Sequence, residues 1–311
     1  MAWYTTLDEK VSSYLPDLKW LHDEPLSRHT SFRIGGPARR MALPHCCEQI
    51  VLLMGLLDEA GIRPLLLGNG TNLLVSDAGV DTVVIKTGEL LGAIERSGET
   101  ELTAEAGVSL ARLATFAWKQ GLTGLEFAHG IPGSLGGGVV MNAGAYGAEL
   151  KDVLTEVVAL FPDGVRTLKP EELQLSYRHS IFSEQEEAVV LRATVRLARG
   201  DSAAIKARMD ELMQKRKASQ PLEWPSAGST FKRPAGNFAG VLIEKSHLKG
   251  TRIGGAEVSR KHAGFVINTG EATCADVLAL IDRVQQTVLC DSGILLEPEV
   301  KIICSDKTGG F

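Results

Sequence analysis

The alternation of hydrophobic and polar positions in the first two thirds of the chain predicts a mixture of helices and strands. Residues 46–60 are apolar at helical spacing and end at Gly61, and residues 109–120 predict a second helix between a Ser109 cap and Gly121. Short apolar runs, several of them β-branched, predict strands at 63–67, 81–86, 101–106 and 188–197 and a hairpin at 153–168 that turns at Pro162-Asp163-Gly164. We therefore expect an α+β fold.

The pattern changes near residue 200. Residues 201–217 predict a polar helix that ends in a basic cluster, and residues 219–225 predict a loop. The predicted elements beyond this loop are helices at 238–247 and 273–289 and strands near 252–258, 263–268 and 294–303. They form a second α+β unit, so we place a domain boundary near residue 205, between 1–205 and 206–311, with the last strand able to return to the first domain.

Length, composition and charge narrow the class of protein. A chain of 311 residues exceeds the size at which one hydrophobic core stops growing, which indicates two domains. No apolar run approaches the ~20 residues that span a bilayer, and the N-terminus lacks the features of a signal peptide. A net charge of −5 argues against nucleic acid as the main partner. Five cysteines without a CxxC pair indicate reduced thiols in the cytoplasm and no metal site.

Two glycine-rich loops are candidates for ligand binding. In residues 67–75 a strand enters a turn of two glycines and two asparagines, whose successive amides form an anion-binding nest or simply a tight β-turn. In residues 128–147 glycine is too frequent for a helix or a strand, and the apolar residues between the glycines argue against a linker. Neither loop has a Rossmann or P-loop pattern, so two separate loops indicate a large ligand such as a dinucleotide.

Three further segments carry groups suited to chemistry. In 176–180 an arginine follows a tyrosine and can form a fixed fork for a carboxylate. In 225–234 a serine lies in a turn of small residues just before a basic pair, and in 296–301 a carboxylate opens an apolar strand. Each segment alone is more typical of a structural role: a surface arginine, a turn or cap serine, and an edge residue.

Taken together and in this order, these segments resemble one family, the UDP-N-acetylenolpyruvoylglucosamine reductases (MurB). The matching segments are His29–Gly36, Leu67–Val75, Ala128–Gly147, Tyr177–Arg178, Pro225–Pro234, Ile253–Ala256 and Glu297–Val300. Each is a weak motif, but seven in register over residues 29–303 are highly specific. The short chain is similar to the compact branch of the family, which lacks an insertion in the substrate domain.

The resemblance implies a PCMH-type FAD-binding domain of two lobes and a smaller C-terminal domain that binds a UDP-sugar. NADPH would reduce non-covalently bound FAD and leave, and UDP-N-acetylglucosamine enolpyruvate would then enter. The product would be UDP-N-acetylmuramate, a cytoplasmic peptidoglycan precursor, which links the reaction to cell wall biogenesis, cell shape and cell division. The resemblance implies no nucleic acid, membrane or obligate protein partner.

The resemblance also assigns roles to individual residues. Arg178 and Glu299 match the family's two electrophilic residues, which stabilise charge on the substrate carboxylate, and Glu299 would have to be protonated or share a proton. Ser229 matches the donor that protonates the carbanion or enol left after hydride transfer. The implied cofactor-binding residues are Asn69, Gly70, Thr71, Asn72, Leu73, Gly130, Ile131, Pro132, Gly133, Ser134, Gly136, Gly137, Asn142, Gly144, Ala145, Tyr146 and Gly147. The implied substrate-binding residues are Tyr177, Lys217, Arg233 and His262.

Two of these assignments have a simpler alternative. Part of the family has asparagine at the place of Arg233, so that substrate contact does not carry over, and the cation either serves a phosphate or is solvated. Lys217, next to Arg216, suits a diphosphate but is equally typical of a solvated basic helix end.

Two other functions compete with the reductase. A different PCMH-type flavoenzyme, an oxidase or dehydrogenase, would share residues 29–200 but has no reason to keep the Ser229 turn and the Glu299 strand. A non-catalytic binder of UDP-sugars or nucleotides would keep the basic cluster but needs no pair of glycine loops. The absorbance spectrum, followed with NADPH and then with the sugar, separates all three.

Overall fold

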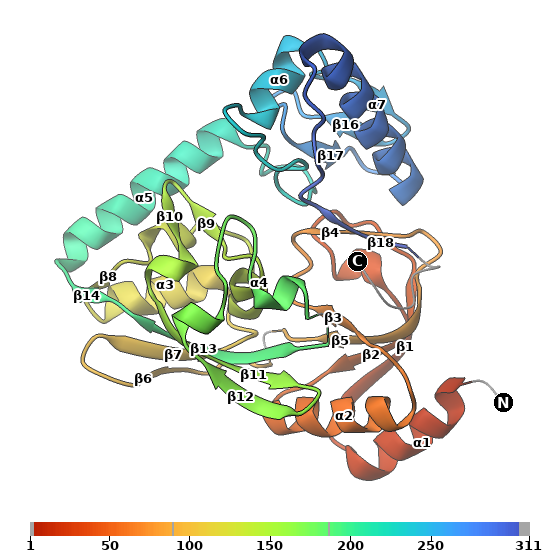
Figure 1. The fold of residues 1–311 in the computed structure, drawn as a ribbon, viewed down its shortest axis with the longest axis vertical. Coiled ribbons are helices and arrows are strands. Elements are labelled where there is room, and N and C mark those ends of the chain that lie inside the picture. Colours follow the sequence, from red (N-terminus) through yellow and green to blue (C-terminus); the bar gives the residue numbers. More distant parts are fainter. Residues whose placement is uncertain (1–2, 89, 186, 305–311) are drawn as a thin grey trace. The chain divides into compact units, whose positions relative to one another are not determined.

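The computed structural model describes residues 3–88, 90–185 and 187–304 (Figure 1). The chain forms two compact units. The first unit consists of Met1–His22, Arg40–Asn69 and Thr82–Lys215, and the second of Asp23–Arg39, Gly70–Asp81 and Arg216–Phe311. Two segments from the N-terminal third of the chain therefore belong to the same unit as the C-terminal third. The functional boundary near residue 205 stays a prediction.

The elements follow the expected mixture of helices and strands. The helices are α1 (Trp3–Tyr14), α2 (Cys47–Glu59), α3 (Leu110–Lys119), α4 (Leu135–Val140), α5 (Ser202–Ser219), α6 (Ala239–Lys245) and α7 (Cys274–Ser292). The strands are β1 (Lys19–Pro25), β2 (Pro37–Leu43), β3 (Leu65–Leu67), β4 (Leu73–Val75), β5 (Val80–Lys86), β6 (Ile94–Arg96), β7 (Glu101–Glu105), β8 (Leu122–Thr123), β9 (Gly144–Ala145), β10 (Ala148–Glu149), β11 (Leu154–Phe161), β12 (Gly164–Leu168), β13 (Val189–Arg196), β14 (Ala198–Arg199), β15 (Arg252–Ile253), β16 (Ala256–Val258), β17 (Val266–Asn268) and β18 (Lys301–Ile303).

Most predicted elements are confirmed, and the closing strand is the main difference in length. The five predicted helices correspond to α2, α3, α5, α6 and α7. The predicted strand at 294–303 is regular only in β18, because Pro298 has no amide to donate and makes an isolated bridge to Phe231 instead.

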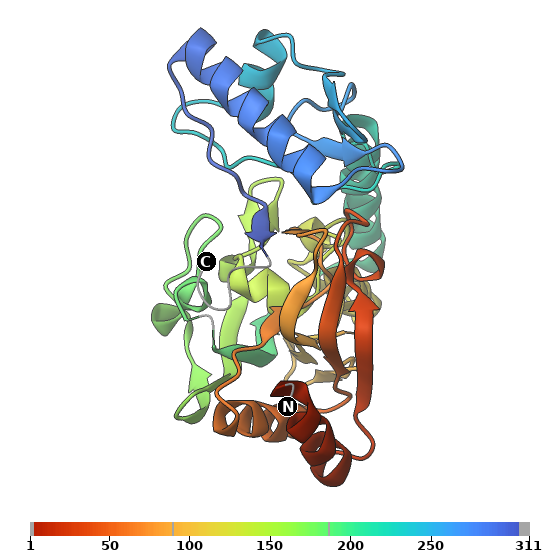
Figure 2. The ribbon, with the colours of Figure 1, turned by 90° about the vertical axis from the view of Figure 1, so that its right-hand side faces the viewer.

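One part of the first unit is built on α1, α2 and the four-stranded sheet of order β1-β2-β5-β3, in which β3 runs parallel to β5 (Figure 2). Amphipathic spacing buries Leu7 and Val11 of α1 against Leu53 and Leu57 of α2 and Ile85 of β5. These side chains form a hydrophobic core separate from that of the second sheet.

An ion pair attaches α1 to β2. Arg40 is 4% exposed and donates from Nε and Nη2 to the two carboxylate oxygens of Asp8, at 2.7 and 2.6 Å. Burial alone would raise the pKa of Asp8, but hydrogen bonds from Arg40 and Trp20 leave that pKa below its ordinary value. The bidentate geometry satisfies a buried guanidinium that would otherwise be costly.

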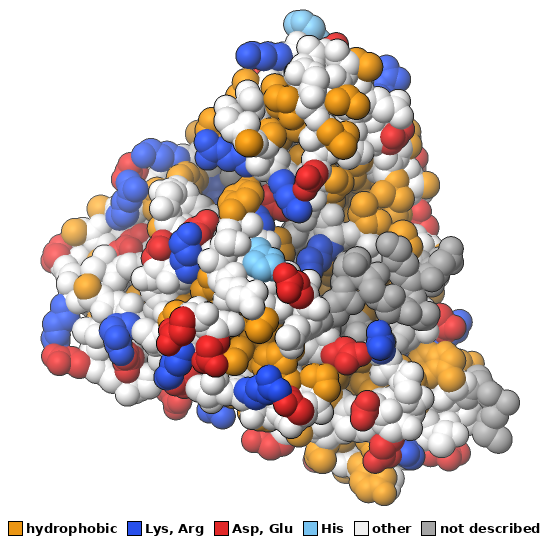
Figure 3. Space-filling model, in the orientation of Figure 1, with side chains coloured by type: hydrophobic (Ala, Val, Ile, Leu, Met, Phe, Trp, Pro, Cys, Tyr) orange, Lys and Arg blue, Asp and Glu red, His pale blue; other side chains and the backbone are white. Residues whose placement is uncertain are grey.

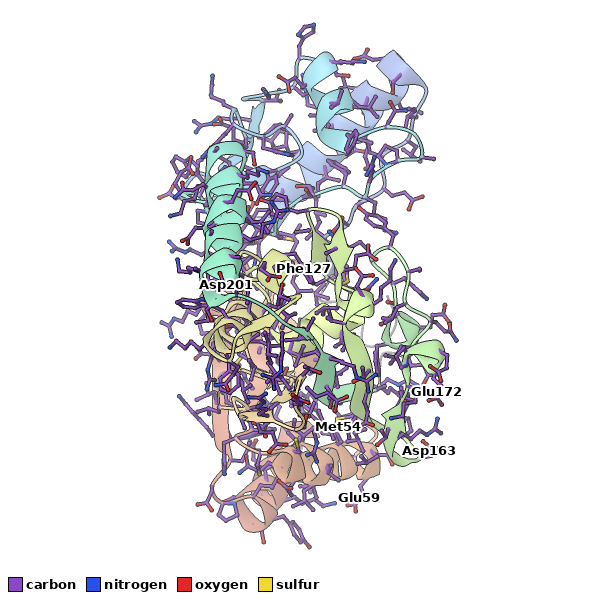
Figure 4. All side chains as sticks on the ribbon, turned by 90° about the vertical axis from the view of Figure 1, so that its left-hand side faces the viewer. Met54, Glu59, Phe127, Asp163, Glu172 and Asp201 are labelled. Atoms are coloured by element: carbon purple, nitrogen blue, oxygen red, sulfur yellow. The ribbon has the colours of Figure 1, made fainter. Side chains whose placement is uncertain are left out.

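The other part of the first unit is an antiparallel sheet of order β12-β11-β13-β7-β6. Alternate residues of β13, among them Ala193 and Val195, point into a core that α3 completes with Leu113 and Ala117. Asp163 lies at the tip of the β11–β12 hairpin, as Figure 4 shows.

The glycine-rich stretch contains a helix, so the expectation that its glycines exclude one is wrong. Gly136, Gly137 and Gly138 all lie in α4. A Cβ on Gly136 would come within 2.9 Å of the Cβ of Ala106, and one on Gly138 within 3.0 Å of Leu150. The glycines therefore let α4 approach its neighbours closely, and this packing outweighs their low helix propensity.

The second unit has its own core around α6, α7 and the antiparallel sheet β15-β16-β17. Phe32 and Leu74, from the two N-terminal segments, are buried in the same cluster as Phe231. Asp77 accepts hydrogen bonds from the first amides of α7, at 2.9 Å from Cys274 and 3.3 Å from Ala275. A carboxylate at a helix N-terminus is stabilising, so it helps to hold segment 70–81 in this unit.

No described helix combines the length and the apolarity needed to cross a bilayer. Figure 3 shows Lys and Arg side chains intermixed with Asp and Glu over the face in view. Within the described ranges, no cluster of three or more His, Cys, Asp or Glu side chains could hold a metal ion.

Candidate active site

The first glycine loop follows the buried end of β3. Within the described residues, the backbone amides of Asn69, Gly70 and Thr71 donate no hydrogen bond. Gly70 has φ of 61°, and a Cβ there would come within 2.1 Å of the His29 carbonyl oxygen. The Gly70 carbonyl in turn accepts from the Ser31 amide at 3.0 Å. Segment 29–31 thus holds the 69–71 turn in place. The amides of that turn make no hydrogen bond to the described residues and suit an anion.

The second glycine loop meets the first within the first unit. The Oγ of Ser134 lies 2.6 Å from the position that a Cβ on Gly68 would take. The same Oγ accepts from the Gly137 amide at 3.4 Å and caps α4. Two backbone hydrogen bonds hold the loop, from the Leu110 amide to the Gly133 carbonyl at 2.9 Å and from the Leu135 amide to the Val108 carbonyl at 2.7 Å. A glycine at position 68 is required for this approach.

A β-hairpin with a tight turn follows α4. β9 and β10 pair around Tyr146 and Gly147, whose φ angles are both positive, as a type I′ turn requires. The Tyr146 hydroxyl donates to the Leu212 carbonyl in α5 at 3.1 Å. This contact secures the hairpin tip to the long helix.

Arg178 lies in a two-residue turn. Ser176 and His179 exchange backbone hydrogen bonds at 3.1 and 3.2 Å, and Arg178 between them has φ of 55°. Its Nη2 lies 3.5 Å from the Gly144 carbonyl oxygen of β9, and its guanidinium carbon lies 5.2 Å from the ring centre of Tyr177. The side chain is half-buried, and Tyr177 is exposed. The structure therefore places Arg178 next to the hairpin of the glycine-rich stretch.

In the second unit the Ser229 turn and the Glu299 segment are paired. The Glu299 amide donates to the carbonyl of Thr230, and the Lys232 amide donates to the carbonyl of Glu297, both at 2.8 Å. Thr230 is buried, and its Oγ1 accepts from the Val266 amide at 3.0 Å. Two segments that the sequence separates widely are thus held side by side by backbone hydrogen bonds.

The hydroxyl of Ser229 is uncommitted. It has no hydrogen-bond partner among the described residues, and the side chain is only half-buried. A structural turn serine normally bonds to nearby backbone. The hydroxyl is therefore available to a ligand.

Asn72 connects the first glycine loop to the Glu299 segment. Its Nδ2 donates to the Glu299 carbonyl at 3.1 Å, and its own carbonyl accepts from the Lys301 amide at 3.0 Å. Leu73 then pairs with Lys301, where β4 runs parallel to β18. The amide of Asn72 therefore orients the backbone beside Glu299.

The three remaining predicted residues lie in the second unit. Lys217 is exposed near the end of α5, and its carbonyl accepts from Lys261 Nζ at 2.6 Å. The guanidinium carbon of Arg233 lies 3.9 Å above the ring centre of Phe238. Stacking of this kind holds an arginine in one orientation.

His262 is a neutral donor. Its Nδ1 accepts from the Gly264 amide at 3.1 Å, and its ring lies against Gly240 and Gly264, where a Cβ would be 3.3 and 3.0 Å away. Burial lowers the pKa of His262, so the imidazole is neutral at pH 7. Because Nδ1 accepts a hydrogen bond, the proton of the neutral ring is on Nε2.

A cavity on the five-stranded sheet is separate from all the predicted residues. It has a volume of about 580 Å³ and is lined by Ser97, Glu101, Thr103, Thr155, Glu156, Lys169, Pro170, Thr194 and Arg196. Its charges are paired, Arg196 with Glu101 at 2.7 Å and Lys169 with Glu156 at 2.7 Å. The cavity contains none of the groups expected of the active site.

Comparison with known proteins identifies the family. Residues 220–303 match the C-terminal domain of UDP-N-acetylenolpyruvoylglucosamine reductase, and residues 38–168 match an FAD-binding domain. A UDP-N-acetylenolpyruvoylglucosamine reductase of Caldanaerobacter subterraneus is 50% identical over 96% of this chain and 98% of its own length. The chain belongs to the UDP-N-acetylenolpyruvoylglucosamine reductase family. One from Geobacillus kaustophilus is 49% identical over 91% of this chain and 92% of its own length.

A solved structure of the same family agrees with the fold. The crystal structure of UDP-N-acetylenolpyruvylglucosamine reductase (MurB) from Thermus caldophilus is 34% identical, with a TM-score of 0.79 over 92% of this chain and 98% of its own. The predicted fold class is confirmed, an FAD-binding domain with two lobes joined to a smaller α+β domain. The two sheets of the first unit, with their separate cores, correspond to the two lobes.

Sequence reasoning did not single out the groups that hold the predicted residues in place. Ser180 holds the turn of Arg178 to α4, Ser31 supports the turn of Gly70, and Glu149 accepts from the Asn142 side chain. The partners of Ser180 and Ser31 are far away in the sequence, so spacing gives no signal. The pattern did mark Asn142, but not which groups its side chain contacts.

Proposed function

We propose that this chain reduces UDP-N-acetylglucosamine enolpyruvate to UDP-N-acetylmuramate, with NADPH as the hydride source and FAD as the carrier. The observation that carries the proposal is the backbone pairing of the Ser229 turn with the Glu299 segment, in a member of this reductase family. A flavoenzyme that oxidised a small metabolite has no need for a proton donor and an acid on paired segments.

The two glycine loops fit the cofactor. The uncommitted amides of Asn69, Gly70 and Thr71 suit the diphosphate, and Gly68 leaves room for the Ser134 loop beside them. We place the diphosphate on the backbone of 69–73 and 130–137. Bound FAD would supply the hydride chemistry that connects NADPH to the enol ether of the sugar.

The protein supplies charge and protons for the sugar half of the reaction. As hydride reaches the vinyl carbon, negative charge builds up on the neighbouring carboxylate, where Arg178 and a protonated Glu299 would stabilise it. Ser229 would then donate its hydroxyl proton to the carbanion or enol. The lack of any competing partner for the Ser229 hydroxyl among the described residues supports this role.

Lys217, Arg233 and His262 of the second unit and Tyr177 of the first unit suit the nucleotide part of the substrate. Lys217 is an exposed ammonium for a diphosphate, and Arg233 is a stacked guanidinium that can serve a phosphate. His262 offers an Nε2 proton, and the exposed Tyr177 offers an aromatic face and a hydroxyl. We assign these four residues to substrate binding, and we place the reaction in the cytoplasm, where its two soluble substrates occur.

The absorbance spectrum of the purified protein tests the proposal. We expect flavin bands that bleach with NADPH under anaerobic conditions and recover when UDP-N-acetylglucosamine enolpyruvate is added. Bleaching without recovery indicates a different flavoenzyme, and a protein that takes up no flavin is a non-catalytic binder. Either result contradicts the proposal.

We further propose that the flavin is bound non-covalently. Covalent attachment requires a His or Cys at the loop, and His129 is the only such residue in the two glycine loops. Acid precipitation should release all the yellow colour into the supernatant. Colour that stays in the pellet contradicts this proposal, and His129→Ala then identifies the attachment site by abolishing it.

A further inference from the structure

Left-handed backbone is concentrated around Arg178. Among the described residues of the first unit, the non-glycine residues with positive φ are Asn142, Tyr146, Gln174 and Arg178. Such conformations are unfavourable for L-residues, persist only where the surroundings impose them, and cluster at functional sites. All four lie between the end of α4 and the turn that carries Arg178.

The side chain of Asn142 joins the segments of this region. It is 0% exposed and follows α4 with φ of 41°. Its Nδ2 donates to the Glu149 carboxylate at 3.0 Å and to the Ser176 carbonyl at 3.0 Å. Its Oδ1 accepts from the Lys151 amide at 3.0 Å. One amide thus links α4, the β9–β10 hairpin and the turn of Arg178.

These bonds use the polar groups of the Asn142 side chain. Both N–H groups donate to protein acceptors, and the oxygen accepts from a protein amide. The side chain is therefore committed to the fold, so the cofactor contact that the resemblance implies at Asn142 stays a prediction, left to its backbone. One partner of the Asn142 side chain indicates what this commitment does, because Ser176 opens the turn that carries Arg178.

The far end of the same turn is fixed as well. Ser180 is 0% exposed, and its Oγ donates to the Val140 carbonyl at the end of α4, at 2.7 Å. The turn is therefore held at Ser176 by Asn142 and at Ser180 by α4. Between these two anchors the backbone of Arg178 has little freedom, and its guanidinium reaches the Gly144 carbonyl of the hairpin that Asn142 also holds.

We propose that Asn142 is a positioning residue that holds the Arg178 turn in the geometry needed for the substrate carboxylate. The proposal rests on the proposed function and deepens it. Asparagine is required because two acceptors and one donor face the side chain. An aspartate would turn a carboxylate oxygen toward Glu149 and the Ser176 carbonyl, and would lose both bonds.

Asn142→Asp tests the proposal, with each half-reaction followed separately by stopped-flow absorbance. Misplacement of a catalytic group by about 1 Å costs roughly 100-fold in rate. We therefore expect reoxidation of the flavin by UDP-N-acetylglucosamine enolpyruvate to slow by about 10- to 100-fold. Reduction of the flavin by NADPH, which does not use the Arg178 turn, should change by less than about threefold.

The double variant with Arg178→Ala separates positioning from general damage. If Asn142 acts through Arg178, Asn142→Asp should slow the sugar half-reaction no further once Arg178 is absent, since coupled residues are not additive. Asn142→Gly, which keeps the positive φ and introduces no charge, should give the same pattern and serves if the Asp variant does not fold.

Gln174→Glu is the matched control. It makes the same amide-to-acid change at a residue of the same region with φ of 50°, but the Gln174 side chain is exposed and has no partner among the described residues. Its half-reactions should equal those of the wild type. The proposal is overturned if Asn142→Asp has no effect, slows both half-reactions alike or multiplies the loss of Arg178→Ala. Failure of the wild-type flavin to reoxidise with the sugar contradicts the proposed function instead.

Discussion

The uncommitted hydroxyl of Ser229 distinguishes it from an ordinary turn serine. The backbone around it is fixed by Thr230, which bonds to both Gly264 and Glu299, so the hydroxyl keeps its place without bonds of its own. A hydroxyl that donated to the protein would have to break that bond before it gave its proton to carbon, so the absence of such a bond among the described residues suits a proton donor. The backbone bonds of Thr230 position the Ser229 hydroxyl without using it.

Ser229→Ala should therefore separate the two halves of the reaction. We expect reduction of the flavin by NADPH to stay close to wild type, and reduction of the sugar to fall by ~10²–10⁴-fold, as for loss of a general acid. Stopped-flow traces of each half-reaction measure both rates. Equal slowing of the two would show that the serine is structural.

Glu299 can act as a proton partner or only as a hydrogen-bonding group. Glu299→Gln keeps the shape and a donor but cannot exchange a proton, whereas Glu299→Ala removes both functions. We expect the Gln variant to lose nearly as much turnover as the Ala variant, because an acid beside a developing enolate is a proton partner. Steady-state turnover with saturating NADPH measures both. Near-normal turnover of Glu299→Gln would leave only a positioning role.

The sequence marks the candidate chemical residues, whose roles stay predictions, but not the contacts that support them. Arg178, Ser229 and Glu299 lie in motifs that the resemblance marks, and the pairing of the latter two makes their assigned roles compatible. Asn142 was marked too, but its buried hydrogen bonds to Glu149 and Ser176 depend on how the chain folds back. Tertiary contacts of a side chain follow no regular spacing in the sequence, so the role of Asn142 could not be predicted from the sequence.

At the scale of elements, the spacing of apolar residues predicted the helices that bury one apolar face. The helices α2 and α3 each bury one apolar face, and the sequence bounds agree with the structure within about two residues. The helix α4 was missed because its glycines are selected for close approach to Ala106 and Leu150. Propensity describes an isolated segment, and here tertiary packing overrides it.

The first glycine turn offers a test of close approach against backbone strain. Gly70→Ala adds a Cβ that would meet the His29 carbonyl oxygen at 2.1 Å, in a residue with φ of 61°. We expect a lower melting temperature and a loss of FAD retained on gel filtration, because the turn must shift away from segment 29–31. The clash comes in addition to about 1–2 kcal/mol for left-handed backbone.

Gly61→Ala is the matched control for this turn. Gly61 has φ of 66°, and a Cβ there would meet nothing within 4 Å. The Gly61→Ala variant should lose only the stability that left-handed backbone costs, and it should retain FAD. If Gly70→Ala keeps as much FAD and stability as Gly61→Ala, the contact with His29 does not shape the loop.

At the scale of the whole molecule, His262 should make stability depend on pH. Burial disfavours its charged form and holds the pKa of His262 below its ordinary value of 6.5, with Lys249 acting in the same direction and Glu244 against it. Between the folded pKa and 6.5 the unfolded chain binds more protons than the folded one, so stability rises with pH in this window. The contribution is fully present above 6.5 and is lost as the pH falls to the folded pKa.

Chemical denaturation of the wild type and His262→Asn should reveal this difference. The Asn oxygen can still accept from the Gly264 amide but does not titrate. We expect the wild type to lose more free energy of unfolding than the variant as the pH falls from about 7 to 5. Parallel pH profiles would mean that His262 titrates at the same pH folded and unfolded.

The parallel pairing of β4 with β18 has a consequence for synthesis on the ribosome. β4 emerges early in translation, whereas β18, its partner in a two-stranded sheet, follows almost the whole of the chain. Until then the edge of β4 lacks its strand partner, and exposed edges invite aggregation. The second unit can therefore complete its fold only after translation has passed residue 303.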